Sequence, residues 1–422
     1  MAFPIFGSSK THEKVPLPVL ALILGFATPP EMSLDLGGLR LSPYRIVVIA
    51  MLIPCLVRIF GKRAAAWHLG DTFMLLHCMW VLLALIAYAG LGQGIESGGI
   101  YLFEAMGGYL VGRCLIKDAR QFLAVSRLML SVVLCFMCIA ALESVSGNHF
   151  IRQASRTVLG GPPLPAIEPR LGLHRAFVSF DHPILYGIFC ASTLGMAVYI
   201  PMGPADAFAS RFRPAISAFA TFFSLSSGAF SALGAQLFLV GWDKVTRGIG
   251  HRWSILGGGI LSIWTVITLL SNRGPVKVFL TYFTFSPGTG YNRLRIWEYG
   301  SAEVIRHPIF GIGLGDWERP AWMVSGSMDN FWLATAVRYG VPALIFLVAA
   351  IGYLVYRQVR VSTRQTLYCK CRSAWMVSII GLSLAACTVH FWNALFCLFC
   401  FLIGSGAWLA SGPTRERNRR FR

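Results

Sequence analysis

The sequence predicts an all-α protein, built as a polytopic bundle of about twelve transmembrane helices. Of its 422 residues, 55% are hydrophobic and only 13% are charged, whereas a soluble domain carries about 25% charged residues. Apolar runs recur along the whole chain, and each is long enough to cross a hydrocarbon layer about 30 Å thick. Because backbone groups in lipid must pair internally, we expect these runs to be helices of a single membrane domain, 1–422.

The expected spans lie near 15–30, 41–58, 72–92, 99–116, 124–145, 182–201, 214–226, 229–242, 253–271, 337–356, 374–391 and 394–410. The first span follows Lys10 and Lys14 and resembles a signal peptide. It lacks a clear small-x-small cleavage site, so we expect it to be retained.

The basic residues predict the orientation of the bundle. The net charge is +19, but most lysines and arginines fall in alternate loops, where they hold those loops in the cytoplasm. This distribution explains the charge without nucleic-acid binding. It places both termini in the cytoplasm, leaves short outer loops such as 93–98 almost uncharged, and makes the basic tail 411–422 an anchor to anionic lipid.

The cysteines indicate packing rather than disulfides or metal binding. None of the eleven lies in either of the two long loops, 146–181 and 272–336, where an exported loop held by disulfides would need them. The CxxC pairs, Cys135/Cys138 and Cys397/Cys400, lie inside apolar runs and are expected to be small packing residues.

One predicted span carries two charged residues. Glu104 and Arg113 are nine positions apart in the sequence, so on a helix they point to opposite faces and do not form an obvious pair. Gly108 and Gly112, which lie between them, have the spacing that lets two membrane helices approach closely.

The two long loops, 146–181 and 272–336, fall outside the membrane, the second between spans nine and ten. Long ordered loops are where function tends to reside. The first loop brings Arg170 and Arg175 to the point where the chain re-enters the membrane. Their guanidinium groups suit the oxygens of a lipid diphosphate, and interfacial anchoring by arginine is the alternative.

The second loop contains a helical pattern that places Arg293 and Trp297, four residues apart, on one face. This helix is expected to end at His307-Pro308, because a proline disfavours helix in the residue before it. The glycines that follow, at 311, 313 and 315, predict either a plain turn or a nest of amides that binds an anion. Trp297 either stacks on a sugar ring or anchors the loop at the interface.

Asp329 lies near the outer mouth of the predicted bundle, just before another span. Its carboxylate would cap that helix, as Ser327 could do instead, or would act as a general base. Composition alone favours capping.

Together these features resemble the family of O-antigen ligases and polysaccharide polymerases. The likeness rests on the layout of spans and long outer loop, and on motifs within roughly 170–185 and 290–345. The motifs are Arg170-Leu-Gly-Leu-His-Arg175 with His182-Pro183, Arg293 with Trp297, His307-Pro308-Ile-Phe-Gly311-Ile-Gly313, Asp329-Asn330-Phe-Trp-Leu and Tyr339-Gly340.

The resemblance implies a metal-independent glycosyltransferase of a bacterial inner membrane, with its long loops in the periplasm of a Gram-negative cell. Family members transfer glycans from undecaprenyl diphosphate to an acceptor sugar and release the lipid diphosphate. They are thought to use no metal or other cofactor, and their helical core is similar to the GT-C class. The implied partners are the lipid-linked glycan, membrane lipids and a chain-length regulator of the export machinery.

The resemblance also implies roles for particular residues. Arg175 and Arg293 would stabilise the departing diphosphate, and Asp329 would activate the acceptor hydroxyl. The implied substrate-binding residues are Arg170, Arg295, Trp297, His307, Trp317, Asn330 and Trp332.

Three functions compete. Ligases of this family typically have His-Asn where this chain has Asp329-Asn330, a change that favours a polymerase of secreted polysaccharide or O-antigen over a ligase acting on lipid A-core. A transporter or flippase is the third possibility. Such proteins often show internal repeats and charges at mid-membrane, whereas this sequence shows no repeat between its halves.

Overall fold

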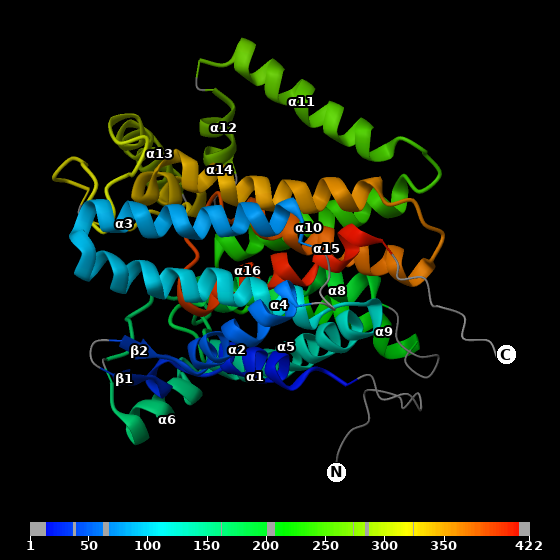
Figure 1. Ribbon diagram of the computed structural model, residues 1–422, viewed down its shortest axis with the longest axis horizontal. Coiled ribbons are helices and arrows are strands. Elements are labelled where there is room, and N and C mark those ends of the chain that lie inside the picture. Colours follow the sequence, from blue (N-terminus) through cyan, green and yellow to red (C-terminus); the bar gives the residue numbers. More distant parts are fainter. Residues whose placement is uncertain are drawn as a thin grey trace.

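The computed structural model describes residues 14–36, 39–61, 67–161, 163–200, 207–272, 274–282, 287–323 and 325–412. Almost all regular structure in these ranges is helical, so the predicted all-α class is confirmed. The exception is a short antiparallel hairpin, β1 (Leu34–Leu36) with β2 (Leu39–Leu41). Figure 1 shows the long helices of the bundle packed side by side, with α11 lying apart from the others.

Most helices follow one another along the chain with short connections, but longer segments without a helix join α6 to α7 and α13 to α14. The N-terminal half contains α1 (Leu17–Phe26), η1 (Pro30–Met32), α2 (Pro43–Phe60), α3 (Leu69–Leu102), the π-helical turn η2 (Phe103–Gly107), α4 (Gly108–Leu115), α5 (Ala119–Ser146), α6 (Phe150–Leu159), α7 (Pro183–Ala191) and α8 (Leu194–Tyr199). The C-terminal half contains α9 (Ala207–Phe222), α10 (Ser227–Val245), α11 (Arg252–Leu270), α12 (Gly274–Tyr282), α13 (Pro287–Arg306), α14 (Phe331–Arg360), α15 (Thr366–Ala385), α16 (Asn393–Ser405) and η4 (Ala407–Ser411).

Six helical segments of the described chain are long and apolar enough to cross a bilayer. They are Pro43–Phe60, Leu69–Leu115, Ala119–Ser146, Arg252–Leu270, Phe331–Arg360 and Asn393–Ser411. Leu17–Phe26 and Pro183–Tyr199 are shorter apolar helices. The chain therefore has the helices of a multi-pass membrane protein. The predicted lipid-anchoring tail lies almost entirely outside the described residues.

The helix α3 reverses direction at Gly90, whose φ of +78° lies in the left-handed region that glycine adopts readily. Beyond the bend, a Cβ added to Gly94 would lie 2.5 Å from Ile86 Cα, and one added to Gly98 would lie 2.6 Å from Leu82 Cδ1. The two arms thus form a close hairpin. The predicted loop at 93–98 is wrong, because a single glycine makes the turn and these residues are helical.

Small residues bring α4 against α16, as the glycine spacing predicted. A Cβ on Gly108 would lie 2.7 Å from the carbonyl oxygen of Cys397, and one on Gly112 would lie 2.3 Å from that of Phe401. All eleven cysteines lie in the described ranges, and none of them is in a disulfide. Cys397 and Cys400 are buried in this packing, whereas Cys135 and Cys138 are exposed on α5.

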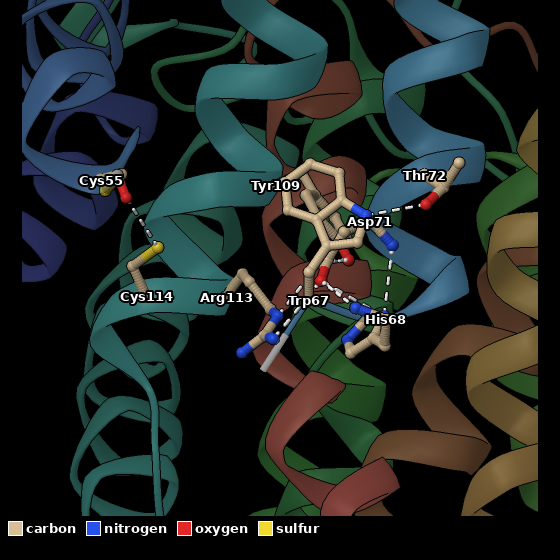
Figure 2. Close-up of polar contacts among 8 residues, drawn as sticks. All are labelled: Cys55, Trp67, His68, Asp71, Thr72, Tyr109, Arg113 and Cys114. Atoms are coloured by element: carbon tan, nitrogen blue, oxygen red, sulfur yellow. Dashed lines mark hydrogen bonds and ion pairs between the residues drawn. The ribbon is translucent and has the colours of Figure 1, made fainter. Parts of the chain in front are cut away.

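The two charged residues of the predicted fourth span have separate partners. Glu104 accepts hydrogen bonds from the Tyr44 hydroxyl at 2.6 Å and from Arg45 Nε at 2.8 Å. Arg113 Nε donates to Asp71 Oδ1 at 3.1 Å, and the Tyr109 hydroxyl donates to the same oxygen at 2.6 Å (Figure 2). Buried charges need such partners, and these two pairs join α2 to η2 and α3 to α4.

The loop that follows α13 is attached to a kink in α14. The helix α13 ends at Arg306, so the prediction that His307-Pro308 terminates it is confirmed. The kink is at Gly340, with φ of +83°, where an added Cβ would lie 1.8 Å from the carbonyl oxygen of Ile309. Val341 N donates to Pro308 O at 2.8 Å, which holds the loop in place.

The glycine-rich stretch forms a plain turn rather than an anion nest. Gly311 N donates to His307 O at 3.2 Å, Gly313 N to Arg338 O at 2.8 Å, and Gly315 N to Ile312 O at 2.9 Å. These amides are therefore engaged by backbone carbonyls and do not point together at an open site.

Candidate functional site

Three arginines from the two long loops converge on one turn of the backbone. Residues 224–227, hereafter the arginine turn, connect α9 to α10. Arg170 Nη1 donates to Leu225 O at 3.1 Å, and Arg175 Nε donates to Ser224 O at 3.2 Å. Arg293 Nη2 donates to Ser227 Oγ at 3.2 Å, so one short segment holds all three guanidinium groups.

The backbone of the first loop positions Arg170 and Arg175. Arg170 and Leu173 exchange backbone hydrogen bonds of 2.9 and 3.0 Å, which close a tight turn. His174 N then donates to Ser144 O at 3.0 Å, and Ala176 N donates to Phe223 O at 2.9 Å. The loop is therefore attached to the ends of α5 and α9, next to the arginine turn.

Two of the three guanidinium groups are almost fully buried. Arg293 is 5% exposed, and its Nε and Nη1 have no hydrogen-bond partner. Burial lowers the pKa of Arg293; nearby Asp329 opposes this shift, and Arg170 adds to it. A buried cation with unpaired donors is costly by itself and is stabilised when an anion accepts those donors.

Arg175 has a similar environment. It is 8% exposed, and burial lowers its pKa to about 10, with Arg170 contributing in the same direction. Arg170 itself is exposed at the rim of the cluster. The three like charges thus gather at one place, and Arg293 and Arg175 are the two held away from water.

Asp329 faces this cluster and does not cap α14. Asn330 is the N-cap, because its Oδ1 accepts a hydrogen bond from Leu333 N at 3.0 Å. The Asp329 carboxylate is half-buried, accepts a hydrogen bond from Ser327 Oγ at 2.9 Å, and lies within electrostatic range of Arg293. The capping alternative therefore applies to the neighbouring residue, which leaves Asp329 available for chemistry.

The tryptophans named from the sequence lie in packed surroundings. Trp317 is buried, and its indole N–H donates to Gly326 O at 3.1 Å within the loop. Trp332 is half-buried, and its indole N–H donates to Ser383 O at 2.9 Å. Trp297 is half-buried against the same small cluster of apolar side chains as Trp317.

Arg295 and His307 lie away from the arginine turn. Arg295 is two residues from Arg293, so it points to the other side of α13. It pairs with Glu298 at 2.9 Å and donates to the Tyr291 hydroxyl, and this hydrogen bond raises its pKa. The His307 side chain is 53% exposed and lies 3.5 Å from Glu303 at the end of the helix.

The sequence did not single out His182 or Ser227 as members of the site. His182 lies within electrostatic range of both Arg170 and Arg175, and its Nδ1 accepts a hydrogen bond from Ile184 N at 3.2 Å as the N-cap of α7. Ser227 binds Arg293 directly. The pair Ser226-Ser227 before an apolar run predicts a helix start, but not the ligand of an arginine.

Comparison with known proteins adds nothing to this geometry. The sequence matches no protein-family model and no curated protein. The functional argument therefore depends on the residues themselves.

Proposed function

We propose that this chain is a membrane glycosyltransferase that polymerises oligosaccharide repeats linked to undecaprenyl diphosphate. The single observation that carries the proposal is the arginine turn, where Arg170, Arg175 and Arg293 converge and Arg293 retains two buried, unpartnered N–H donors. Guanidinium groups arranged in this way match the oxygens of a diphosphate in geometry and in charge.

The proposed reaction is the attack of an acceptor hydroxyl on the anomeric carbon of a lipid-linked sugar. Asp329 accepts the hydroxyl proton as the new glycosidic bond forms. The bond between the anomeric carbon and the diphosphate oxygen breaks, and the diphosphate leaves with its electron pair. Arg175 and Arg293 stabilise the negative charge that develops on it, work that a divalent cation performs in other enzymes.

The proposal includes the larger membrane architecture. About twelve spans, arranged as in the GT-C class, would place both termini in the cytoplasm and the arginine turn at the outer surface. Each predicted span overlaps at least one helix of the structure, which supports this arrangement. A lipid diphosphate of the outer leaflet would then reach Arg175 and Arg293 from the membrane side.

Substitution of Arg293 or Asp329 tests the proposal directly. In cells that make the polymer, Arg293→Ala and Asp329→Asn are expected to abolish long chains while the protein remains in the membrane, because each removes a charge that acts in the transition state. Arg306→Ala is the matched control, since Arg306 lies on the same helix but pairs with Glu303 and Glu318 at the surface. Polymer length is read on gels, and normal length in both variants would refute the proposal.

The lipid-linked glycan that accumulates separates the three candidate functions. Single repeats are expected for a polymerase, whereas full-length lipid-linked chains would indicate a ligase. Purified protein that elongates a lipid-linked repeat without an ion gradient would exclude transport.

A further inference from the structure

A separate cavity of about 180 Å³ lies between the segment that follows α1, the residues that precede α7 and the start of α16. Its polar lining comes from Thr28, Arg40, Ser42, Arg45, Ser179, Asp181 and Asn393. Three aromatic residues, two prolines, Leu185 and Ala394 complete the wall. The proposed transfer reaction uses none of these residues.

The charged groups of this cavity are already compensated. Arg45 Nε donates to Glu104 at 2.8 Å, and its Nη1 donates to Arg40 O at 2.7 Å. Arg40 donates from Nε to Ser33 Oγ at 2.7 Å and from Nη2 to Pro30 O at 2.8 Å. The cavity therefore does not present its arginines to an anion in the way that the arginine turn does.

One side chain that lines the cavity retains hydrogen-bonding capacity. The Asp181 carboxylate accepts one hydrogen bond, from Asn393 Nδ2 at 3.2 Å, although a carboxylate offers about four acceptor positions. The remaining positions suit a ligand that carries hydroxyl groups, because a hydroxyl can donate to a carboxylate.

A bidentate ion pair holds the walls of the cavity in place. Arg152, on α6, is 5% exposed and donates from Nε and Nη2 to Glu31 at 2.9 and 2.7 Å. Its Nη1 donates to Phe180 O at 2.6 Å. One side chain thus joins the segment after α1 to the segment before α7, which makes the cavity a preformed site.

The cavity shares a wall with the arginine cluster. Asp181 lines the cavity, and the next residue, His182, lies within electrostatic range of Arg170 and Arg175. His182 has an extended backbone, with φ of −152° and ψ of 146°, and consecutive side chains of an extended chain point to opposite sides. A ligand in the cavity and a diphosphate at the arginine turn would therefore lie on opposite sides of this extended segment.

We propose that this cavity binds one uncharged sugar ring of the glycan substrate. Asp181 hydrogen-bonds to its hydroxyl groups, while Tyr44 and Phe180 pack against its apolar C–H face. The identification of the ligand as part of a glycan rests on the proposed function. To that function the cavity adds a binding position that selects which sugar is accepted.

Binding is tested with the full chain in micelles of a detergent that has no sugar head group. Saturation-transfer NMR with glucose, galactose, mannose and rhamnose is expected to detect at least one of them. Asp181→Asn and the cavity-filling Ala394→Phe should weaken it about tenfold or more, whereas the surface variant Ser301→Ala should bind normally. Failure to bind any neutral sugar, or equal binding by Ala394→Phe, would overturn the inference.

A second readout separates this inference from the proposed function. In a polymerisation assay, Asp181→Asn should raise KM for the lipid-linked repeat about tenfold while inorganic pyrophosphate still raises the melting temperature as in the unmodified protein. Polymer formation with unchanged KM in both cavity variants would overturn the cavity and leave the polymerase. Sugar binding that depends on Asp181, in a protein that elongates no glycan, would leave the cavity and overturn the polymerase.

Discussion

The three guanidinium groups at the arginine turn differ in their contact with water. Arg175 and Arg293 are buried, whereas Arg170 is exposed. Because burial penalises the charged form, a cation with a high intrinsic pKa is required at the buried positions. Arginine meets this requirement, since the pKa of Arg175 remains at about 10 after burial and the group stays charged at neutral pH.

Replacing Arg175 by lysine is expected to make activity depend on pH. The same burial would lower the pKa of a lysine below its ordinary value of about 10.4. Arg175→Lys should therefore lose its positive charge, and with it polymerisation, at a lower pH than the arginine does, as the pH rises through the lowered pKa of the lysine. Initial rates between pH 6.5 and 9.5 would measure this.

The control is Arg170→Lys, at the exposed member of the cluster. Because this position is exposed, water compensates the charge of a lysine there, so the pH profile should match that of the unmodified protein over the same range. Parallel profiles for Arg175→Lys and Arg170→Lys would contradict the assigned role of burial.

At this scale the sequence pointed to the arginines more directly than to the contacts of the aromatic residues. The resemblance implied that Arg170, Arg175 and Arg293 act on one diphosphate, and in the structure all three contact the arginine turn. It also implied that Trp317 and Trp332 bind substrate, which stays a prediction; both donate their indole N–H to backbone carbonyls. Every residue has a backbone carbonyl that can accept a hydrogen bond, so the sequence could not reveal which carbonyl each indole contacts.

Among the helices, α14 contains a position, Gly340, that requires glycine. Its kink at Gly340 combines a positive φ with a carbonyl oxygen, that of Ile309, against the α-carbon. The kink shapes the point at which the outer loop and the bundle meet.

Gly340→Ala is expected to destabilise the protein by about 2–4 kcal/mol, because the new methyl group both strains the backbone and collides with Ile309. Gly352→Ala, on the same helix, is the control, since an added Cβ there meets nothing within 4 Å. Thermal unfolding in detergent measures the difference. Equal melting temperatures for the two variants would show that the loop is not held against the kink.

The ends of helices could be predicted where a local sequence signal marks them. His307-Pro308 correctly placed the end of α13. The sequence placed the reversal of α3 at residues 93–98, whereas the chain turns at Gly90. This stretch contains several glycines, and the sequence alone does not show which of them turns the chain. In the structure, Gly94 and Gly98 pack against the preceding arm. The helix α14 begins at Phe331, earlier than expected, because Asn330 provides its cap outside the apolar run.

On the scale of the whole molecule, the basic residues predict cytoplasmic termini. A green fluorescent protein fused after Arg422 should fluoresce, because that reporter folds in the cytoplasm, and alkaline phosphatase at the same position should be inactive. The same pair inserted after Ser325, in the outer loop, should give the opposite result. An active phosphatase at the C-terminus would contradict the proposed orientation.

The general architecture follows from composition, whereas the way the helices pack does not. Hydropathy predicted helices along the entire chain, since lipid leaves the backbone few alternatives. Hydropathy gave no means of foreseeing that α11 would contain no buried residue, because lipid-facing and protein-facing helices are equally apolar.

The arginine turn brings together segments that are synthesised at different times during translation. Arg170 and Arg175 emerge first, the turn itself follows, and Arg293 and Asp329 arrive only after α10, α11 and α12 have been inserted. Until then the two earlier cations repel each other, and Asp329 has not yet been made. Nascent chains halted before α13 should therefore insert normally yet hold the first loop open, so that the proposed diphosphate site is incomplete in every product that ends before Arg293.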